Sequence, residues 1–301
     1  MSRNKIIITS FVLIAFFANM ASKAQNIIQI EPIFEYPAAP EELESLTDKS
    51  DYLVAHFWDQ LDFKKTEPLN QIALNDAFRV YTTPLRFANA KNAIESIDKL
   101  VSKVSGNPTL LVQFTKAAEE NFYGRNAEIW ADDFYLKFLD AASKNKKISE
   151  KRRERYKDKA ALLRSTAVGE TAPTFNFEEP DGKISTYFPM STPTIIIFGD
   201  PEDTDWRLAR LKLDTHTPLN QAIDKGKLNI IYIALNPQEN LKDTFSNYSS
   251  KWKVGKSEDI NDKYDIRIVP SIYYIGSDGK IVMKNVPLNM IIEKALETAG
   301  V

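Results

Sequence analysis

The sequence predicts an α/β protein in two parts, an all-helical N-terminal domain over residues 41–167 and a second domain over residues 168–301. Up to about Ala167, apolar residues recur at three- and four-residue steps, which is the period of a helix. After Val168 they gather instead in short runs separated by turns. The order of these runs is β-α-β and then β-β-α, which builds a central sheet with helices on its faces.

Residues 1–24 have the features of a secretory signal peptide. Arg3 and Lys5 precede a nearly continuous apolar run, and Ala21-Ser22-Lys23-Ala24 offers small residues for a cut after Ala24. The rival interpretation is a membrane anchor, but the run is shorter than the roughly 20 residues that a bilayer needs. We therefore expect an exported protein, periplasmic or secreted, with no stable membrane insertion after cleavage.

The composition excludes several kinds of function. The formal net charge of −2 argues against a general binder of nucleic acid or other polyanions. The chain has no cysteine, so neither disulfides nor thiol chemistry are available to it. Its two histidines, His56 and His216, lie far apart, so a zinc site is not expected. We interpret His56 as a hydrogen-bonded core residue and His216 as a surface turn residue, and we expect no cofactor and no metal.

The segment after the signal peptide, residues 25–40, reads as an extended arm or an edge strand, because its prolines exclude a central strand. Pro40 before Glu41 and Glu42 predicts a helix start, since acidic side chains favour the positive end of the helix dipole. One face of the first helix is expected to consist of Leu53, Val54, Phe57, Trp58 and Leu61.

Capping residues and apolar spacing predict the later helices, five or six in all. Asn107 and Pro108 suit the N-cap and first turn of a helix that runs to Gly124, and Ser149 can cap a last helix that reaches Arg164. The inward-facing residues of the stretch before Gly106 are expected to be Phe87, Ala90, Ile94, Ile97, Val101 and Val104. Those of the helix after Gly124 are expected to be Trp130, Phe134 and Phe138.

Residues 144–164 contain ten lysines and arginines and three acidic residues. A solvated helix face is the simplest interpretation, and a patch for an acidic partner or anionic lipid is the alternative. Only Tyr156 interrupts the basic residues as an aromatic, so a platform for single-stranded nucleic acid is not expected.

In the second domain, the stretch from Thr194 to Leu213 predicts a strand, a tight turn and a helix N-terminus. This order presents reactive groups at the carboxyl end of a central strand. Further strands are predicted over residues 228–235, 272–275 and 280–283, the last two joined by a Gly-Ser-Asp-Gly hairpin. A helix over residues 287–299 closes the chain.

Two motifs of this domain resemble those of thioredoxin-like, peroxiredoxin-related domains. Residues 169–175, Gly-Glu-Thr-Ala-Pro-Thr-Phe, resemble the G-x-x-A-P-x-F entry of that family, and residues 264–273 resemble its proline-containing strand. The resemblance implies a thioredoxin-like fold and a cis peptide bond between Val269 and Pro270. The preceding part, with Tyr-Leu-Val-Ala-His-Phe-Trp-Asp at residues 52–59, resembles an uncharacterised helical domain of exported Gram-negative proteins.

The chain departs from this family at the redox turn. Relatives carry F-x-D-P-x-C-x-x-C, whereas here Phe198, Asp200 and Pro201 are followed by Asp203 and Trp206 in the two cysteine positions. Dithiol exchange needs a low-pKa thiolate and a resolving thiol one turn later. A carboxylate and an indole supply neither, so this chemistry is excluded.

The altered turn has three interpretations. Asp203, Thr204 and Asp205 suit a helix N-cap, which is worth about 0.5–2 kcal/mol. The carboxylates of residues 200–205 could instead hold a divalent cation, but the order lacks the glycine and glutamate of a calcium loop. A hydrolase with paired carboxylates would need opposed acids in a cleft. Trp206 either packs against the sheet or anchors a peptide.

We therefore expect an exported thioredoxin-like module that binds or scaffolds a protein or peptide rather than exchanging disulfides. The expected groove consists of Phe198, Asp200, Pro201, Asp203, Trp206, Val269 and Pro270. The alternative is an enzyme with metal-assisted, non-thiol chemistry at the acidic turn. In a third hypothesis the basic helix is the working part.

Overall fold

The computed structural model describes residues 31–64, 67–189, 191–237 and 239–300. The expected signal peptide, residues 1–24, and the first part of the arm lie outside these residues. Among the described residues, no helix is both long enough and apolar enough to cross a bilayer.

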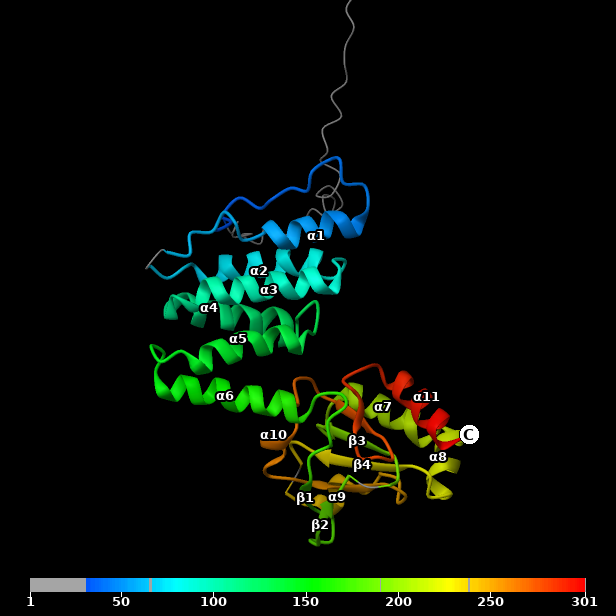
Figure 1. The fold of residues 1–301 in the computed structure, drawn as a ribbon. Helices are drawn as coiled ribbons and strands as arrows, with labels where there is room; N and C mark the ends of the chain where they lie inside the picture. The colour runs from blue at the N-terminus through cyan, green and yellow to red at the C-terminus, as the bar shows by residue number, and fades with distance from the viewer. Residues whose placement is uncertain (1–30, 65–66, 190, 238, 301) are drawn as a thin grey trace, which may run out of the picture. The chain divides into compact units, whose positions relative to one another are not determined.

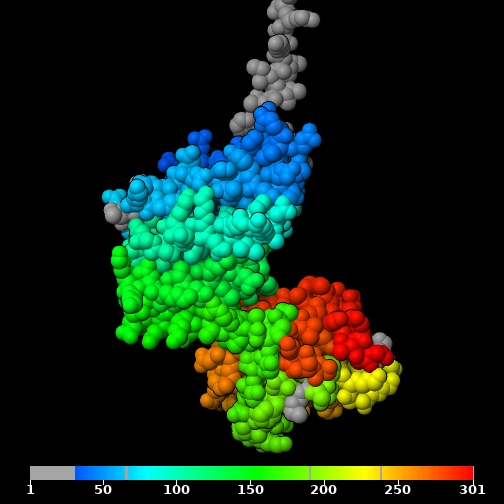
Figure 2. Space-filling model, viewed as in Figure 1, coloured from blue at the N-terminus to red at the C-terminus, as the bar shows by residue number. Residues whose placement is uncertain are grey.

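The first part of the described chain is helical, as the apolar spacing predicts, and its helices lie in successive layers (Figure 1). In the space-filling view the surfaces of neighbouring helices meet without a gap (Figure 2). The last turn of α4 continues as a short π-helix, η1, before the chain turns at Gly124. The elements are α1 Leu46–His56, α2 Gln71–Leu85, α3 Ala90–Ser105, α4 Pro108–Ala118, η1 Glu119–Tyr123, α5 Asp132–Lys144 and α6 Glu150–Ser165.

The first helix begins later than the sequence predicts. Pro40 starts a turn, in which the N–H of Leu43 donates to the carbonyl of Pro40 at 3.2 Å, and not a helix. The N-cap of α1 is Ser45, whose hydroxyl accepts a hydrogen bond from the N–H of Asp48 at 2.9 Å. The hydroxyl of Ser45 thus satisfies one of the backbone N–H groups that a helix leaves unpaired at its start. Glu41 and Glu42, which follow Pro40, do not cap α1.

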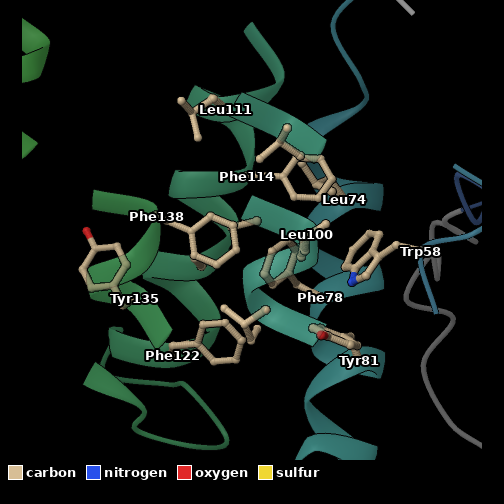
Figure 3. Packing of buried hydrophobic residues seen from close by; sticks show 14 of the residues in the cluster. Trp58, Leu74, Phe78, Tyr81, Leu100, Leu111, Phe114, Phe122, Tyr135 and Phe138 are labelled. Atoms are coloured by element: carbon tan, nitrogen blue, oxygen red, sulfur yellow. The ribbon is translucent and has the colours of Figure 1, made fainter. Parts of the chain in front are cut away.

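Phe78 lies at the centre of the helical core (Figure 3). Its side chain is fully buried, and edge-on or tilted aromatic contacts surround it. Such pairs add about 0.5–1.5 kcal/mol each beyond the burial of apolar area. The ring centroids around it are those of Trp58 at 5.2 Å, Phe114 at 5.5 Å, Phe122 at 5.9 Å and Phe138 at 6.0 Å.

The described part of the arm, residues 31–40, is irregular and forms no strand. Phe34 and Tyr36 anchor it to the helices: Tyr36 stacks on Phe57 with ring centroids 5.3 Å apart, and Phe34 meets Trp58 edge-on at 5.5 Å. Aromatic packing, and not hydrogen bonding to a neighbouring strand, therefore fixes the arm on the helices.

Four expected core positions are corrected. Phe87 lies before α3 and is exposed, and Ala90 and Ile94 are exposed on the outer face of that helix. Trp130 precedes α5, which begins at Asp132, so it does not share the helical face of Phe134 and Phe138. Phe87 and Trp130 continue the spacing beyond the helix, because spacing alone does not mark where a helix begins. Within α3, the residues that face the core are Ala93, Ser96, Ile97, Leu100 and Val104, and the exposed positions lie beside this stripe.

The described residues after the helices form a seven-stranded sheet in the order β2-β1-β5-β4-β3-β6-β7. Strands β3, β4 and β5 are parallel, whereas β6 runs antiparallel to β3 and pairs with β7 in a hairpin. The strands are β1 Phe175–Glu178, β2 Ile184–Tyr187, β3 Thr194–Gly199, β4 Asn229–Ala234, β5 Lys253–Lys256, β6 Ser271–Ile275 and β7 Ile281–Lys284. The helices of this part are α7 Thr204–Asp214, α8 Thr217–Asp224, α9 Leu241–Thr244, α10 Ile260–Lys263 and α11 Leu288–Ala299.

Alternate residues of β3 serve two different cores. Ile195 and Ile197 pack with residues of α7, α8 and α11 on one face of the sheet, while Ile196 and Phe198 pack with Phe175 and other aromatic residues on the opposite face. Both sets are fully buried, which is why this strand reads as a continuous apolar run. Residues 32–301 form one compact unit by their contacts, and the expected boundary between residues 167 and 168 stays a prediction.

Candidate functional site

The turn after β3 begins at Gly199, where the backbone approaches an aromatic ring closely. A Cβ atom at this position would lie 2.9 Å from Cε2 of Tyr232, so a larger residue would displace the ring. The carboxylate of Asp200 then organises the turn: Oδ1 accepts from the N–H of Glu202 at 2.9 Å, and Oδ2 accepts from the side-chain amide of Asn236 at 3.1 Å. The turn is thereby tied to the segment that follows β4.

Asp203, in the position of the first cysteine of thioredoxin-like relatives, caps helix α7. Its backbone is extended (φ −67°, ψ 131°), and its Oδ1 accepts from the N–H of Trp206 at 2.8 Å. The neighbouring Thr204 and Asp205 are exposed. The structure therefore gives this carboxylate a capping role, the first of the interpretations weighed for the turn.

Trp206, in the position of the second cysteine, is fully buried. Its indole stacks on the ring of Tyr232, with centroids 4.5 Å apart and planes 5° apart, and its Nε1 donates to the hydroxyl of Tyr248 at 2.8 Å. Because no part of the side chain reaches solvent, the packing interpretation holds in this structure and the peptide-anchor interpretation does not.

Phe198 is also fully buried, so the expected groove is corrected at this second position. Its ring lies 4.9 Å from that of Tyr264 and 5.9 Å from that of Tyr273, in the core of the opposite sheet face. Asp200, Pro201 and Asp203 keep partly exposed side chains. Without Trp206 and Phe198, the exposed part of the expected groove consists of the turn after β3 and the loop before β6.

That loop ends at Val269 and Pro270, whose peptide bond is cis. Phe198 pairs with Ser271 in the β3–β6 register, so the loop before β6 and the turn after β3 lie at the same end of these two strands. Val269 is 36% exposed. Among the described residues, no backbone–backbone hydrogen bond involves residues 266–269. The loop thus offers unpaired main-chain groups and an apolar side chain next to the turn.

The base of the same loop carries a buried ionic group. Asp265 is fully buried; its Oδ1 accepts from the hydroxyl of Tyr123 at 2.5 Å, and its Oδ2 accepts from Nε of Arg267 at 2.9 Å. Its backbone carbonyl accepts from the hydroxyl of Tyr273 at 2.8 Å. Lys159 lies 3.7 Å from Oδ1 of Asp265 and donates to the Tyr123 hydroxyl.

A second carboxylate, Asp132 at the start of α5, completes this group. It forms ion pairs with Nη1 of Arg267 at 2.7 Å and with Nζ of Lys284 at 2.8 Å. The side chain of Arg267 is only 3% exposed. We call the following six residues the interface cluster, because they join the helical part of the chain to the sheet: Tyr123, Asp132, Lys159, Asp265, Arg267 and Lys284.

The interface cluster shifts the pKa values of its own members. Burial opposes ionisation of Asp132, but hydrogen bonds from Arg267 and the positive charge of Lys284 outweigh it and hold the pKa of Asp132 below its usual range. Burial lowers the pKa of Lys159 despite the nearby Asp265. Burial, reinforced by Asp265, raises the pKa of Tyr123. These shifts favour a charged Asp132 and a neutral, hydrogen-donating Tyr123 at neutral pH.

Sequence reasoning missed this cluster because its members lie far apart along the chain. Arg267 and Asp132 are separated by 135 residues. The available signal was local: Asp265 and Arg267 alternate with isoleucines in the strand-like stretch before Pro270. Charged residues at such positions are rarely buried unless they are paired. The sequence before Pro270 therefore indicates that Asp265 and Arg267 pair with other charged side chains, but it does not identify those side chains.

Three of the four carboxylates of the acidic turn have separate partners. Asp200 and Asp203 accept the hydrogen bonds described above, and Glu202 forms an ion pair with Arg207. In the described part of the chain, no group of three or more histidine, cysteine, aspartate or glutamate side chains is arranged to hold a metal ion. The geometry therefore lends no support to metal-assisted chemistry at this turn.

The basic helix α6 lines a groove of about 1010 Å³ that also reaches α4 and α10. Its lining includes four basic and three acidic side chains, so its charge is nearly balanced and specifies no ligand. The basic lining residues are Lys116, Arg152, Arg155 and Lys159, and the acidic ones are Glu119, Asp158 and Asp262.

Neither histidine lies in a core. His56 is exposed at the end of α1, and its Nδ1 is 2.9 Å from Oδ2 of Asp59, which corrects the expected core position. A ring nitrogen of His216 accepts from the N–H of Leu219 at 3.3 Å and so caps α8.

Comparison with known proteins assigns the chain to a family. A family model described as "Domain of unknown function (DUF5106)" matches residues 16–166, half of the chain. The chain belongs to the DUF5106 family. In this DUF5106 protein the match covers every helix from α1 to α6, so it includes the half of the interface cluster that those helices supply. The comparison with curated proteins found no significant match.

The comparison with solved structures found similar proteins from Bacteroides, one of which matches most of the DUF5106 chain. A thioredoxin-like protein from Bacteroides caccae is 19% identical, with a TM-score of 0.70 over 89% of this chain and 99% of that chain. A thioredoxin domain of a thiol-disulfide oxidoreductase from Bacteroides vulgatus is 22% identical and covers 43% of this chain and 98% of its own, with a TM-score of 0.37. A thiol-disulfide oxidoreductase from Bacteroides fragilis is 17% identical and covers 42% and 98%, also with a TM-score of 0.37. The first likeness establishes a thioredoxin-like fold for this cysteine-free chain.

Proposed function

We propose that this thioredoxin-like chain is a binding module that holds an extended polypeptide against the loop of residues 266–270. Without cysteine the chain has no thiol-disulfide chemistry, so the frame is left to serve recognition. The observation that carries the proposal is the unpaired main chain of residues 266–269 beside the exposed Val269. An extended peptide that binds here would form backbone hydrogen bonds with these unpaired groups, as a peptide does when it adds to a strand, and side-chain contacts would then add specificity.

The interface cluster supports this proposal because it fixes the loop in advance. Asp265 and Arg267 lie four and two residues before Val269, and both side chains are buried in ionic contacts. A preorganised loop does not lose conformational entropy when a ligand binds, and this raises affinity. The alternative, metal-assisted chemistry at the acidic turn, lacks a comparable supporting feature.

Selection from a phage-displayed library of random 12-residue peptides tests the proposal. The selected peptides are titrated against the purified chain by fluorescence anisotropy. We expect binding that Val269→Asp weakens at least about tenfold, which corresponds to roughly 1.4 kcal/mol. Ile184→Asp is the matched control, because Ile184 is an exposed apolar residue on strand β2. Failure to select any peptide, or equal affinity for Val269→Asp and the unchanged chain, would refute the proposal.

We also propose that the chain is exported and that residues 1–24 are removed. The basic start, the apolar run and the small residues before Ala24 support this. Mass spectrometry of the protein recovered from the cell envelope tests it: a mature chain that begins at Gln25 is the expected result, and an intact Met1 is the contrary one.

A further inference from the structure

Trp130 differs from the other tryptophans of the chain in being open to solvent. Its side chain is 40% exposed, whereas Trp58, Trp206 and Trp252 are exposed by 4%, 0% and 5%. It is nevertheless held in place, since its Nε1 donates to the carbonyl of Gly124 at 3.1 Å. An ordered, exposed indole is the kind of side chain that most often dominates a binding interface.

The indole of Trp130 faces the loop of residues 266–270 through Arg267. The guanidinium carbon of Arg267 lies 4.2 Å from the ring centroid of Tyr123 and 5.5 Å from that of Trp130. Arg267 is two residues before Val269, and its ion pairs with Asp132 and Asp265 fix its position. The exposed indole therefore packs against a fixed side chain that lies two residues before the exposed Val269 in the chain.

We propose that Trp130 forms a second wall of the peptide site, so that the ligand is an extended peptide with an aromatic or bulky aliphatic side chain that packs on this indole. The inference rests on the proposed function and adds the chemistry of the ligand. The helical part of the chain then contributes directly to recognition, because Trp130 precedes α5.

The charge around the indole favours an apolar peptide side chain over a basic one. Two carboxylates of the interface cluster, Asp132 and Asp265, face three basic groups, Lys159, Arg267 and Lys284. Although cations often bind to tryptophan faces, Arg267 already occupies that position here. A lysine or arginine of the ligand would have to share the indole with the guanidinium of Arg267, and like charges repel.

Fluorine NMR of the chain labelled with 5-fluorotryptophan tests the inference without any substitution at the site. The spectrum contains one resonance for each of four tryptophans, and Trp130→Phe assigns the one of interest. On titration with the peptides selected for the loop, we expect the Trp130 resonance to shift and the Trp58 resonance to stay. Peptides that bind and leave the Trp130 resonance unmoved would overturn this inference while the proposed function stands. If no peptide binds, the proposed function fails first.

Affinity measurements on variants supply a second test. We expect Trp130→Ala to weaken peptide binding about tenfold or more, as for interface hot spots. Trp130→Phe should recover part of the affinity, and replacement of the aromatic or aliphatic residue of the peptide by alanine should cost as much as Trp130→Ala. Ile72→Ala, at an exposed apolar position of α2, is the matched control. Equal affinity for Trp130→Ala and Ile72→Ala, or selected peptides rich in lysine and arginine at the packing position, would contradict the inference.

Discussion

Asp203 illustrates at the scale of one residue how a redox position becomes structural. The N-terminus of a helix stabilises negative charge through its free N–H groups, and in thiol enzymes that charge belongs to a thiolate. Here the same N-terminus of α7 binds a carboxylate, whose Oδ1 accepts from the N–H of Trp206. The electrostatics of the turn therefore persist in this chain while its chemistry does not.

Replacement of Asp203 by alanine should destabilise the chain by about 1 kcal/mol, within the range of about 0.5–2 kcal/mol found for lost N-caps. The orphaned N–H of Trp206 is the physical cause. Urea unfolding followed by circular dichroism measures the change, and Asp203→Asn is the control, because asparagine caps as well as aspartate does. Equal stability of the alanine variant and the unchanged chain would show that the cap contributes nothing.

Trp206 makes a larger contribution by packing. Because it is fully buried and stacked on Tyr232, Trp206→Ala should cost about 3–5 kcal/mol, as for other large-to-small core substitutions. Trp206→Phe should cost less, since it keeps an aromatic ring on Tyr232 but loses the donor to Tyr248. Urea midpoints of both variants measure the two effects. A loss below 1 kcal/mol for the alanine variant, on the scale of an exposed position, would contradict the packing described here.

At the scale of elements, continuous apolar runs made the central strands predictable. The sequence predicts β3, β4, β6 and β7 to within one residue at each end. It misses β1, β2 and β5. The Lys-Val-Gly-Lys sequence of β5 has a single large apolar residue, and the segment is a strand because it pairs with β4. The capping role of Asp203 depends only on neighbouring residues, so it could be predicted from the sequence. The interface cluster was not, because pairing between α5 and the β6 loop is set by tertiary structure alone.

The link between α5 and this loop should depend on pH through Asp132. In the folded chain the pKa of Asp132 is lower than in the unfolded chain, where an aspartate titrates near 3.9. The stabilisation from ionised Asp132 is therefore complete above about pH 3.9, and it is lost as the pH falls toward the lower pKa of the folded state. Asp132→Asn should lower stability at pH 7 by about 3 kcal/mol, because Arg267 and Lys284 are then left with Asp265 as their only shared counter-charge.

The same substitution should flatten the acid side of the stability profile. Urea midpoints between pH 2 and pH 7 measure this, with Asp133→Asn as the control, since Asp133 is the exposed neighbour of Asp132. We expect the Asp133 variant to follow the unchanged chain at every pH. Parallel profiles for the Asp132 variant and the unchanged chain would show that the cluster does not set the pH dependence.

At the scale of the whole molecule, the interface cluster makes the helices and the sheet depend on each other. Three of its members come from the helical part and three from the sheet, and Asp265 and Arg267 are almost completely buried. Breaking a buried ion pair by removing one partner costs about 3–5 kcal/mol, because a charge is left without compensation. The two parts should therefore unfold together as long as the cluster is intact, even though each has its own hydrophobic core.

Substitution of Arg267 by methionine should separate the unfolding of the two parts. The four tryptophans report on both: Trp58 and Trp130 lie in the helical part, and Trp206 and Trp252 lie in the sheet part. With 5-fluorotryptophan, the folded resonances of the unchanged chain should all disappear at one urea concentration, as expected for a cooperative unit. In Arg267→Met the two pairs should disappear at different concentrations, because the parts no longer share the buried charges. Arg207→Met, which removes only an exposed ion pair with Glu202, should leave the single transition intact. Coincident loss of all four resonances in Arg267→Met would mean that apolar contacts, and not the buried charges, couple the helices to the sheet.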